Sequence, residues 1–528
     1  MASFPTPASV NFNTFKGIRT RNGVAAGGVI SATECQNVDF VPSSYDAGVV
    51  IQSTLGNYKT VELDQTTYPG YKIIKGFEFE SENKKYNVLY CENTALNKAV
   101  LLKNYNGVIS AILDESYNLT VTGQANGITM LDSAYNTFVF TNGIEYYAWC
   151  PDGATAIQKL EPEYNSSPIT GLALAEQDGS LVIGSNEGVV LASKKGDITD
   201  FDYNAGETLT KAWYQLFGKP VTAVVPYIDA LLIFTAEDST MLTGNFSAGV
   251  TGGAVRKDAS LGGCMSYESW VKHDKYLFFY DDRQKNIYYY MQNDFGQKVL
   301  GEPIAPEVQK YFNNIKRLQM TSYIGNNRSE IWLLSDDFKL IYDYFIGEWT
   351  ERVCNDITSY FVFDNDVYST AEGKILKEKA GNICVFDGVY YPCKYAMQLI
   401  NLGSFSNMKE MEIQPLVSVT QDYNNTFYID CEIDGKKVKT KHVQSYNNGA
   451  VWGDDTEQTD LTPDNELWDV QIFPSEDDSI IQQIKGKFIS NWYYLRFTFR
   501  TENRGEDFSI TNFELKGITQ ETDTTGRK

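Results

Sequence analysis

The stretch Lys275-Tyr-Leu-Phe-Phe-Tyr-Asp-Asp-Arg-Gln-Lys-Asn-Ile-Tyr-Tyr-Tyr290 contains two runs of apolar and aromatic residues separated by a short polar segment. Such runs, about four to eight residues long, are typical of β-strands, because branched and aromatic side chains pack well on a pleated, half-buried surface. The polar segment between the runs is typical of a turn. We therefore expect this stretch to form an antiparallel hairpin.

The same pattern recurs from about residue 71 to residue 379. Turn doublets such as Asn106-Gly107, Asn126-Gly127 and Asn142-Gly143 lie beside the apolar runs, and these residues adopt positive φ at little cost. A long series of hairpins without alternating helices favours a β-propeller-like array of short antiparallel strands, with about six to eight sheets at roughly 40 to 50 residues each. A large β-sandwich or two stacked barrels is also compatible with these hairpins.

The predicted fold class is all-β, with the propeller-like array followed by a separate C-terminal β-sandwich. From about Ala396 onwards the apolar runs lengthen and alternate more regularly with polar residues, which is typical of a sandwich. We expect an N-terminal extended segment (1–70), a propeller-like domain (71–395), a C-terminal β-sandwich domain (396–520) and a flexible tail (521–528). The sandwich carries an acidic insertion (443–484) that holds ten carboxylates and no Lys or Arg.

One amphipathic helix is expected after Pro303 and Pro306. Apolar residues recur there with helical spacing, at Ile304, Val308 and Phe312 among others. Proline is tolerated in the first turn of a helix. We interpret this segment as a packing helix.

Composition and charge exclude some classes of function. The 528 residues include 68 Asp and Glu against 45 Lys and Arg, which gives a net charge of −23. A surface this acidic argues against wrapping or reading nucleic acid. With 42% hydrophobic and 14% aromatic residues the chain is expected to be a packed globular protein.

No secretory signal or membrane span is predicted. The first basic residue is Lys16, no unbroken apolar segment precedes it, and the most apolar stretch is interrupted by Pro226 and Asp229. The cysteines contain no Cys-x-x-Cys spacing, which favours buried free thiols over a disulfide framework or a zinc site. They are Cys35, Cys91, Cys150, Cys264, Cys354, Cys384, Cys393 and Cys431.

The chain has few residues of the kinds that usually carry out catalysis. It has two histidines, His273 and His442, and it lacks the common signatures of zinc proteases, nucleotide hydrolases and ester hydrolases. We interpret His273 as a turn residue rather than a base. Glycoside hydrolysis needs only two carboxylates, but the adjacent acids fall at predicted turns, where solvated carboxylates are common. These pairs are Asp281-Asp282, Asp336-Asp337 and Asp477-Asp478.

Neither a cofactor nor a metal ion is expected. The acidic stretch from Asp454 to Asp478 lacks the residue spacing of a known calcium-binding loop. A basic strand, Lys436-Lys-Val-Lys-Thr-Lys441, precedes it. This strand either docks an acidic neighbour or is an edge strand protected by lysines against aggregation.

The order of several segments resembles the tail nozzle, or packaged-DNA stabilisation (tail accessory), proteins of short-tailed bacteriophages. The likeness covers about residues 17 to 520 and is best from 188 to 415; it does not extend to the acidic insertion. The segments that carry it are Ser31-Ala-Thr-Glu-Cys-Gln-Asn37, Gly56-Asn-Tyr-Lys59, Gly188-Val-Val-Leu-Ala-Ser-Lys-Lys-Gly-Asp-Ile-Thr-Asp-Phe201, residues 227–244, Leu261-Gly-Gly-Cys-Met265, the hairpin at 276–290, the helix after Pro306, Ile341-Tyr-Asp-Tyr-Phe-Ile-Gly-Glu-Trp349 and Leu402-Gly-Ser-Phe-Ser-Asn-Met-Lys409.

This resemblance implies a non-enzymatic virion protein without catalytic, cofactor-binding or metal-binding residues. It implies a homo-oligomeric ring, expected to be a hexamer, that extends the DNA channel below the head-to-tail connector and retains packaged DNA. The implied partners are connector adaptor or ring proteins, other tail or fibre proteins, and genomic double-stranded DNA that passes without sequence-specific binding. The implied location is the virion tail, after assembly in the host cytoplasm.

A second hypothesis comes from another class of function. Exposed aromatic side chains stack on sugars, and turn carboxylates are able to cleave them, so a glycan-binding or glycan-cleaving β-propeller protein, a receptor-binding tail component, is the alternative. An activity screen and a glycan array distinguish the two hypotheses.

Overall fold

The structure is a computed structural model, and its description covers most of the chain. The described residues are 9–12, 14–19, 29–42, 49–132, 135–153, 155–204, 211–243, 255–259, 262–292, 298–325, 328–400, 412–420, 425–445, 468–469, 481–486, 489 and 492–518. Most of the acidic insertion, the tail 521–528 and the segment Leu402 to Lys409 lie outside these residues.

The chain forms two compact units. The propeller unit comprises Tyr58–Lys339 and Asn355–Glu378, and the second unit comprises Met1–Asn57, Leu340–Cys354 and Lys379–Lys528. This division differs from the linear one that we expected, because each unit draws on distant parts of the chain. The described part of residues 1–57 forms five strands of the second unit rather than an extended segment.

Within the described residues, the propeller unit contains six four-stranded antiparallel sheets. Their strands are β7 (Lys72–Ser81), β8 (Lys84–Asn93), β9 (Lys98–Tyr105) and β10 (Val108–Leu113); β11 (Asn126–Asp132), β12 (Tyr135–Thr141), β13 (Tyr146–Trp149) and β14 (Ile157–Leu160); β17 (Ala173–Gln177), β18 (Ser180–Gly184), β19 (Val189–Ala192) and β20 (Trp213–Leu216); β21 (Val221–Tyr227), β22 (Ala230–Thr235), β23 (Ser239–Thr243) and β24 (Val255–Ala259); β25 (Trp270–His273), β26 (Tyr276–Asp281), β27 (Asn286–Gln292) and β28 (Lys298–Leu300); and β33 (Ser359–Phe363), β34 (Asp366–Ala371), β35 (Lys374–Lys377) and β6 (Tyr58–Glu62). Hairpins are formed by β29 (Gln319–Gly325) with β30 (Arg328–Leu334) and by β15 (Glu163–Tyr164) with β16 (Ser167–Pro168).

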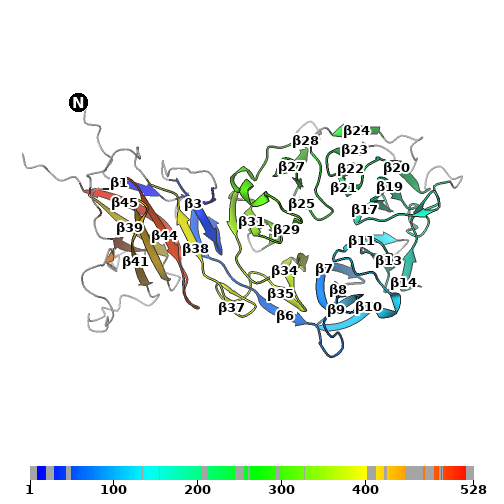
Figure 1. The fold of residues 1–528 in the computed structure, drawn as a ribbon, viewed down its shortest axis with the longest axis horizontal. Helices are drawn as coiled ribbons and strands as arrows, with labels where there is room; N and C mark the ends of the chain where they lie inside the picture. The colour runs from blue at the N-terminus through cyan, green and yellow to red at the C-terminus, as the bar shows by residue number, and fades with distance from the viewer. Residues whose placement is uncertain are drawn as a thin grey trace, which may run out of the picture. The chain divides into compact units, whose positions relative to one another are not determined.

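The six sheets and the β29–β30 hairpin are arranged as a ring, as Figure 1 shows. The first strand of each lies innermost: β7 contacts β11, β11 contacts β17, β17 contacts β21, and β25 contacts β29. The ring is completed where β29 contacts β33 and β33 contacts β7. The last sheet takes its outermost strand, β6, from the start of the unit, where it pairs antiparallel with β35. The all-β, propeller-like prediction is therefore confirmed.

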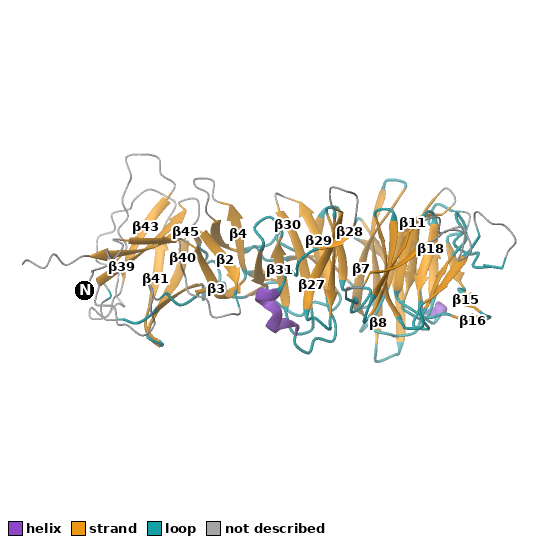
Figure 2. Ribbon diagram, turned by 90° about the horizontal axis from the view of Figure 1, so that it is seen from above, coloured by secondary structure: helices purple, strands orange, loops and turns teal. Residues whose placement is uncertain are grey.

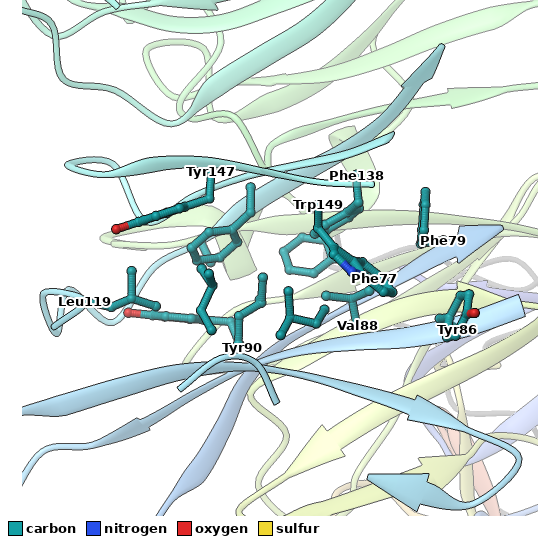
Figure 3. Close-up of a cluster of buried hydrophobic side chains, with 14 of the residues drawn as sticks. Phe77, Phe79, Tyr86, Val88, Tyr90, Leu119, Phe138, Tyr147 and Trp149 are labelled. Carbon is teal, nitrogen blue, oxygen red and sulfur yellow. The ribbon is translucent and has the colours of Figure 1, made fainter. Parts of the chain in front are cut away.

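Apolar side chains fill the space between neighbouring sheets. Figure 3 shows Phe77 and Phe79 of β7 beside Phe138 of β12 and Trp149 of β13, with the aromatic rings of Phe79 and Trp149 5.0 Å apart. Four similar clusters lie between neighbouring sheets. They join the sheet of β11 to that of β17, the sheet of β17 to that of β21, the sheet of β21 to that of β25, and the sheet of β33 to that of β7. Burial of this kind is the main favourable term in folding, so each sheet depends on its neighbours for stability.

The second unit is also built of strands. They are β1 (Ser9–Phe12), β2 (Thr14–Ile18), β3 (Val29–Gln36), β4 (Val38–Pro42), β5 (Val49–Ser53), β31 (Lys339–Asp343), β32 (Glu348–Glu351), β36 (Val385–Phe386), β37 (Val389–Tyr390), β38 (Lys394–Met397), β39 (Glu412–Thr420), β40 (Asn425–Ile433), β41 (Lys436–Ser445), β42 (Trp468–Asp469), β43 (Ile481–Gly486), β44 (Leu495–Arg500) and β45 (Ser509–Ile518). The N-terminal strands β1 and β5 pair antiparallel with the C-terminal strand β45, and β3 pairs with β38.

Two sequence-based expectations need correction. The segment after Pro303 forms a helix as expected, with Val308 and Phe312 buried, but it is a short 3₁₀ helix, η3 (Pro306–Phe312), although the residue spacing was that of an α-helix. The other described helix is η1 (Glu115–Tyr117), and Figure 2 shows how strands dominate around them. Cys384 and Cys393 form a disulfide, whereas free thiols were expected throughout. The fold brings these two cysteines together because β36 and β37 make a tight hairpin between them.

Within the described ranges, none of the helices has both the length and the apolar character needed to span a membrane.

Candidate functional site

The segments that lead into the innermost strands lie together at one end of the propeller unit. Because the innermost strand comes first in each sheet, the segments leading into β11, β17, β21, β25 and β29 lie together. They surround a cavity of about 220 Å³. The lining residues include Gln124, Leu172, Thr222, Ser266, Glu268, Lys316 and Arg317.

A charged triad lies at this cavity: Glu268 and Arg317 line it, and the buried Lys75 contacts Glu268. Glu268 precedes β25, Arg317 precedes β29 and Lys75 lies in β7. The Arg317 guanidinium donates from Nε to Glu268 Oε2 over 2.9 Å and from Nη2 to Oε1 over 3.2 Å. Lys75 Nζ donates to Oε1 of the same carboxylate. The triad therefore links two of the four-stranded sheets and the β29–β30 hairpin.

The electrostatics of the triad keep its carboxylate ionised. Burial would raise the pKa of Glu268, but the attraction of Lys75 and Arg317 and their hydrogen bonds lower that pKa to about 2. Burial, assisted by repulsion from Arg317, lowers the pKa of Lys75, while Glu268 opposes that change. At neutral pH a paired carboxylate of this kind is charged.

Two further groups complete the surroundings of the triad. Lys75 Nζ lies 5.7 Å from the centre of the Tyr267 ring, within the range of a cation–π contact. Arg317 Nη1 donates to the carbonyl of Thr358 over 3.0 Å. These contacts hold the side chains of the triad in one arrangement.

The sequence-predicted histidine has a structural role. His273 ends β25 and is fully buried, where its Nδ1 lies 2.8 Å from Ser322 Oγ and its Nε2 lies 2.7 Å from Ser329 Oγ. Burial lowers its pKa below the usual value. The interpretation of His273 as a turn residue is wrong, because His273 is the last residue of β25 and its side chain is buried. The side chain of His442 lies outside the description.

Of the adjacent acids that are described, three lie in turns or bends, whereas Asp281 is a buried strand residue rather than the solvated turn carboxylate that was expected. Asp281 is buried at the end of β26 and accepts the backbone N–H of Arg283 over 2.9 Å, whereas Asp282 accepts a hydrogen bond from Lys285 over 2.7 Å. Asp336 and Asp337 are exposed in the bend before β31. Asp477 and Asp478 lie outside the described residues, as does most of the stretch from Asp454 to Asp478.

Among the residues that the structure describes, no group of three or more His, Cys, Asp or Glu side chains is placed to hold a metal ion. The basic stretch Lys436 to Lys441 lies in β41, where Lys437 pairs with Asp430 on the neighbouring strand β40 over 2.9 Å.

Sequence reasoning missed the triad and the cavity. Lys75 and Glu268 are separated by 193 positions, and Glu268 and Arg317 by 49. No motif links them, because their proximity depends on the closure of the ring. Glu268 and Arg317 each lie just before a strand of the structure, β25 and β29, neither of which was predicted from the sequence.

Comparisons with known proteins give no family. No protein-family model matches the chain, and no curated protein matches it. Among solved structures, the chain is similar to YCF48 in its complex with a D1 peptide, with 11% identity over 64% of this chain and 97% of that chain, and a TM-score of 0.37. It is also similar to BBS1N in complex with ARL6DN, with 12% identity over 63% and 98% and a TM-score of 0.39, and to the computationally designed Ika8 protein, with 14% identity over 61% and 99% and a TM-score of 0.37.

Proposed function

We propose that this protein is a non-enzymatic structural component of a phage tail. In this proposal several copies form a ring, expected to be a hexamer, that extends the DNA channel below the head-to-tail connector and retains packaged DNA. The observation that carries the proposal is the ordered series of segments that resembles tail nozzle proteins. These segments recur in the same order along a chain whose sheets follow one another in sequence order.

The location of the segments in the fold supports this proposal. Residues 188–201 cover β19 and the turn after it, in which Thr199 donates its backbone N–H to the Asp197 carboxylate over 3.1 Å. Ile198 and Phe201 of the same turn are buried between two sheets. Residues 188–201 therefore contribute a strand, a turn and a contact between two sheets. Such a contribution to the fold is expected of a structural protein.

The negative charge is compatible with DNA that moves past the protein. A net charge of −23 repels phosphates and avoids the counterion-releasing contacts that make a tight DNA binder. The further proposed partners are connector proteins and other tail or fibre proteins. The proposed location is the virion tail.

Self-assembly tests the proposal. We expect the purified full chain to form a closed ring with a central hole, observed by electron microscopy, and the mass in solution to increase when a candidate connector protein is added. A protein that stays monomeric under both conditions and is absent from virions contradicts the proposal. A positive glycan array or glycan cleavage by the monomer supports the alternative of a glycan-directed propeller.

A further inference from the structure

We propose that the cavity beside the Lys75–Glu268–Arg317 triad binds a small oxyanion, a carboxylate or a phosphate group. This inference concerns the interior of a single chain and does not rest on the proposed role in a phage tail.

The triad carries an uncompensated positive charge. Two cations, Lys75 and Arg317, share the single carboxylate of Glu268, and the side chains of Lys75 and Glu268 are only 10% and 5% exposed. Asp336 also attracts Arg317, more weakly than Glu268 does. Each cation contacts Glu268, but one carboxylate balances only one of the two positive charges, and excess charge in a buried place is costly. An anion in the cavity would supply the missing negative charge.

Hydrogen-bond donors remain available for such an anion. A guanidinium has five N–H groups. Three Arg317 N–H groups are used, two by Glu268 and one by the Thr358 carbonyl, so 5 − 3 = 2 remain without a partner among the described residues. The Arg317 side chain is 30% exposed and lines the cavity, so these donors are open to a ligand there.

Lys316 and Gln124 add two more groups to the same cavity. Both are exposed and line it. Neither side chain has a hydrogen bond or an ion pair with another described residue. Together with Arg317 they present an ammonium, an amide and a guanidinium, which is the donor set that recognises carboxylate and phosphate oxygens.

The size of the cavity restricts the ligand. Its volume of about 220 Å³ is below the roughly 300 to 1,000 Å³ of sites that hold drug-sized molecules. A group of a few heavy atoms fits, such as inorganic phosphate, a short dicarboxylate or the side chain of a Glu residue. These ligands share one chemistry, and an experiment distinguishes a free anion from a carboxylate supplied by another protein.

Calorimetric titration of the full chain tests the site with three probes: inorganic phosphate, succinate, and a short glutamate-containing peptide whose matched control has glutamine. Ionic strength is held constant with sodium chloride, and succinamide is the neutral control for succinate. We expect saturable binding of at least one anionic probe and none of the neutral controls. Binding of phosphate or succinate indicates a free anion, and binding of the peptide alone indicates a partner's side chain; both support the site.

Lys316→Met is the decisive variant, because Lys316 is exposed and its loss leaves the triad intact. Loss of one charge-assisted hydrogen bond is expected to weaken binding roughly tenfold. The matched control is Lys195→Met, since Lys195 is exposed in the same unit and is not among the residues that line the cavity. The proposal is overturned if no anionic probe saturates the wild-type chain, or if both variants bind as tightly as the wild type.

Discussion

Val61 in β6 lies opposite Ile375 in β35, and this pairing joins the first and last strands of the propeller unit. The side chain of Ile375 is fully buried in a cluster that also contains Leu63, Ile73 and Phe361. The first strand of the unit thus completes the last sheet. The ring is closed by strands from the two ends of the unit's sequence. Closure of this kind protects sheet edges.

Replacement of Leu63 tests this closure. Leu63 directly follows β6, is 2% exposed and donates its backbone N–H to the Gly373 carbonyl over 2.8 Å. We expect Leu63→Ala to lower the free energy of unfolding by about 2–5 kcal/mol, through lost burial and a new cavity. Urea unfolding followed by tryptophan fluorescence measures this. Tyr58→Ala, at a 45% exposed position of β6, is the control and should cost less than about 1 kcal/mol. Equal effects of the two changes contradict the closure argument.

Gly76 is predicted to tolerate no side chain. A Cβ atom at Gly76 of β7 would lie 2.5 Å from Cε1 of Phe361 in β33, which is far inside van der Waals contact. We expect Gly76→Ala to destabilise the protein by about 1–3 kcal/mol by overpacking the contact between these two sheets. Thermal unfolding of the single variants and of Gly76→Ala with Phe361→Leu provides a double-mutant cycle. If the second change fails to relieve the first, the clash is not the cause.

His273 is predicted to reduce stability in mild acid. Burial lowers its folded-state pKa below the value of about 6.5 for the unfolded chain. The unfolded state therefore binds a proton first as the pH falls, so stability is lost below about pH 6.5. We expect the wild type to lose more stability than His273→Gln between pH 7 and pH 5. Both proteins retain His442, so the difference reports on His273 alone. If the melting temperatures of the wild type and His273→Gln fall by the same amount across this range, the prediction is contradicted.

Asp507 is predicted to destabilise the second unit at alkaline pH. Its carboxyl is buried, Oδ1 has no hydrogen-bond partner among the described residues, and burial raises its pKa from 3.8 to about 7. The folded state therefore favours the neutral form, so stability is fully present below about pH 4 and decreases as the pH rises through 7. Asp507→Asn should raise the melting temperature at pH 8, corresponding to a few kcal/mol, and change it little at pH 4.

The matched control for Asp507 is Glu163→Gln, which removes one negative charge at an exposed position. It is expected to change the melting temperature little at either pH, because an exposed carboxylate is solvated in both states. A similar gain from both variants at pH 8 would indicate a general effect of net charge rather than relief of a buried carboxylate.

Local patterns predicted much of the propeller unit. The stretch 275–290 forms β26 and β27 as expected, with Phe279 opposite Tyr288 in the antiparallel pair. Alternating apolar residues and turn doublets act over a few residues, and neighbouring strands in the chain pair with one another. The division into units was harder to predict, because β1 and β45 pair from opposite ends of the chain and no local signal records such a partner.

The amino-acid sequence by itself determined the strands, the turns between them and the all-β class, because these depend on side-chain periodicity and on backbone preferences within short segments. Only the tertiary structure decided that Lys75, Glu268 and Arg317 meet beside a cavity, that His273 is buried between two serines and that Cys384 is bonded to Cys393. Each of these contacts is set by how strands or hairpins fold against one another, and the triad exists only once the ring of sheets has closed.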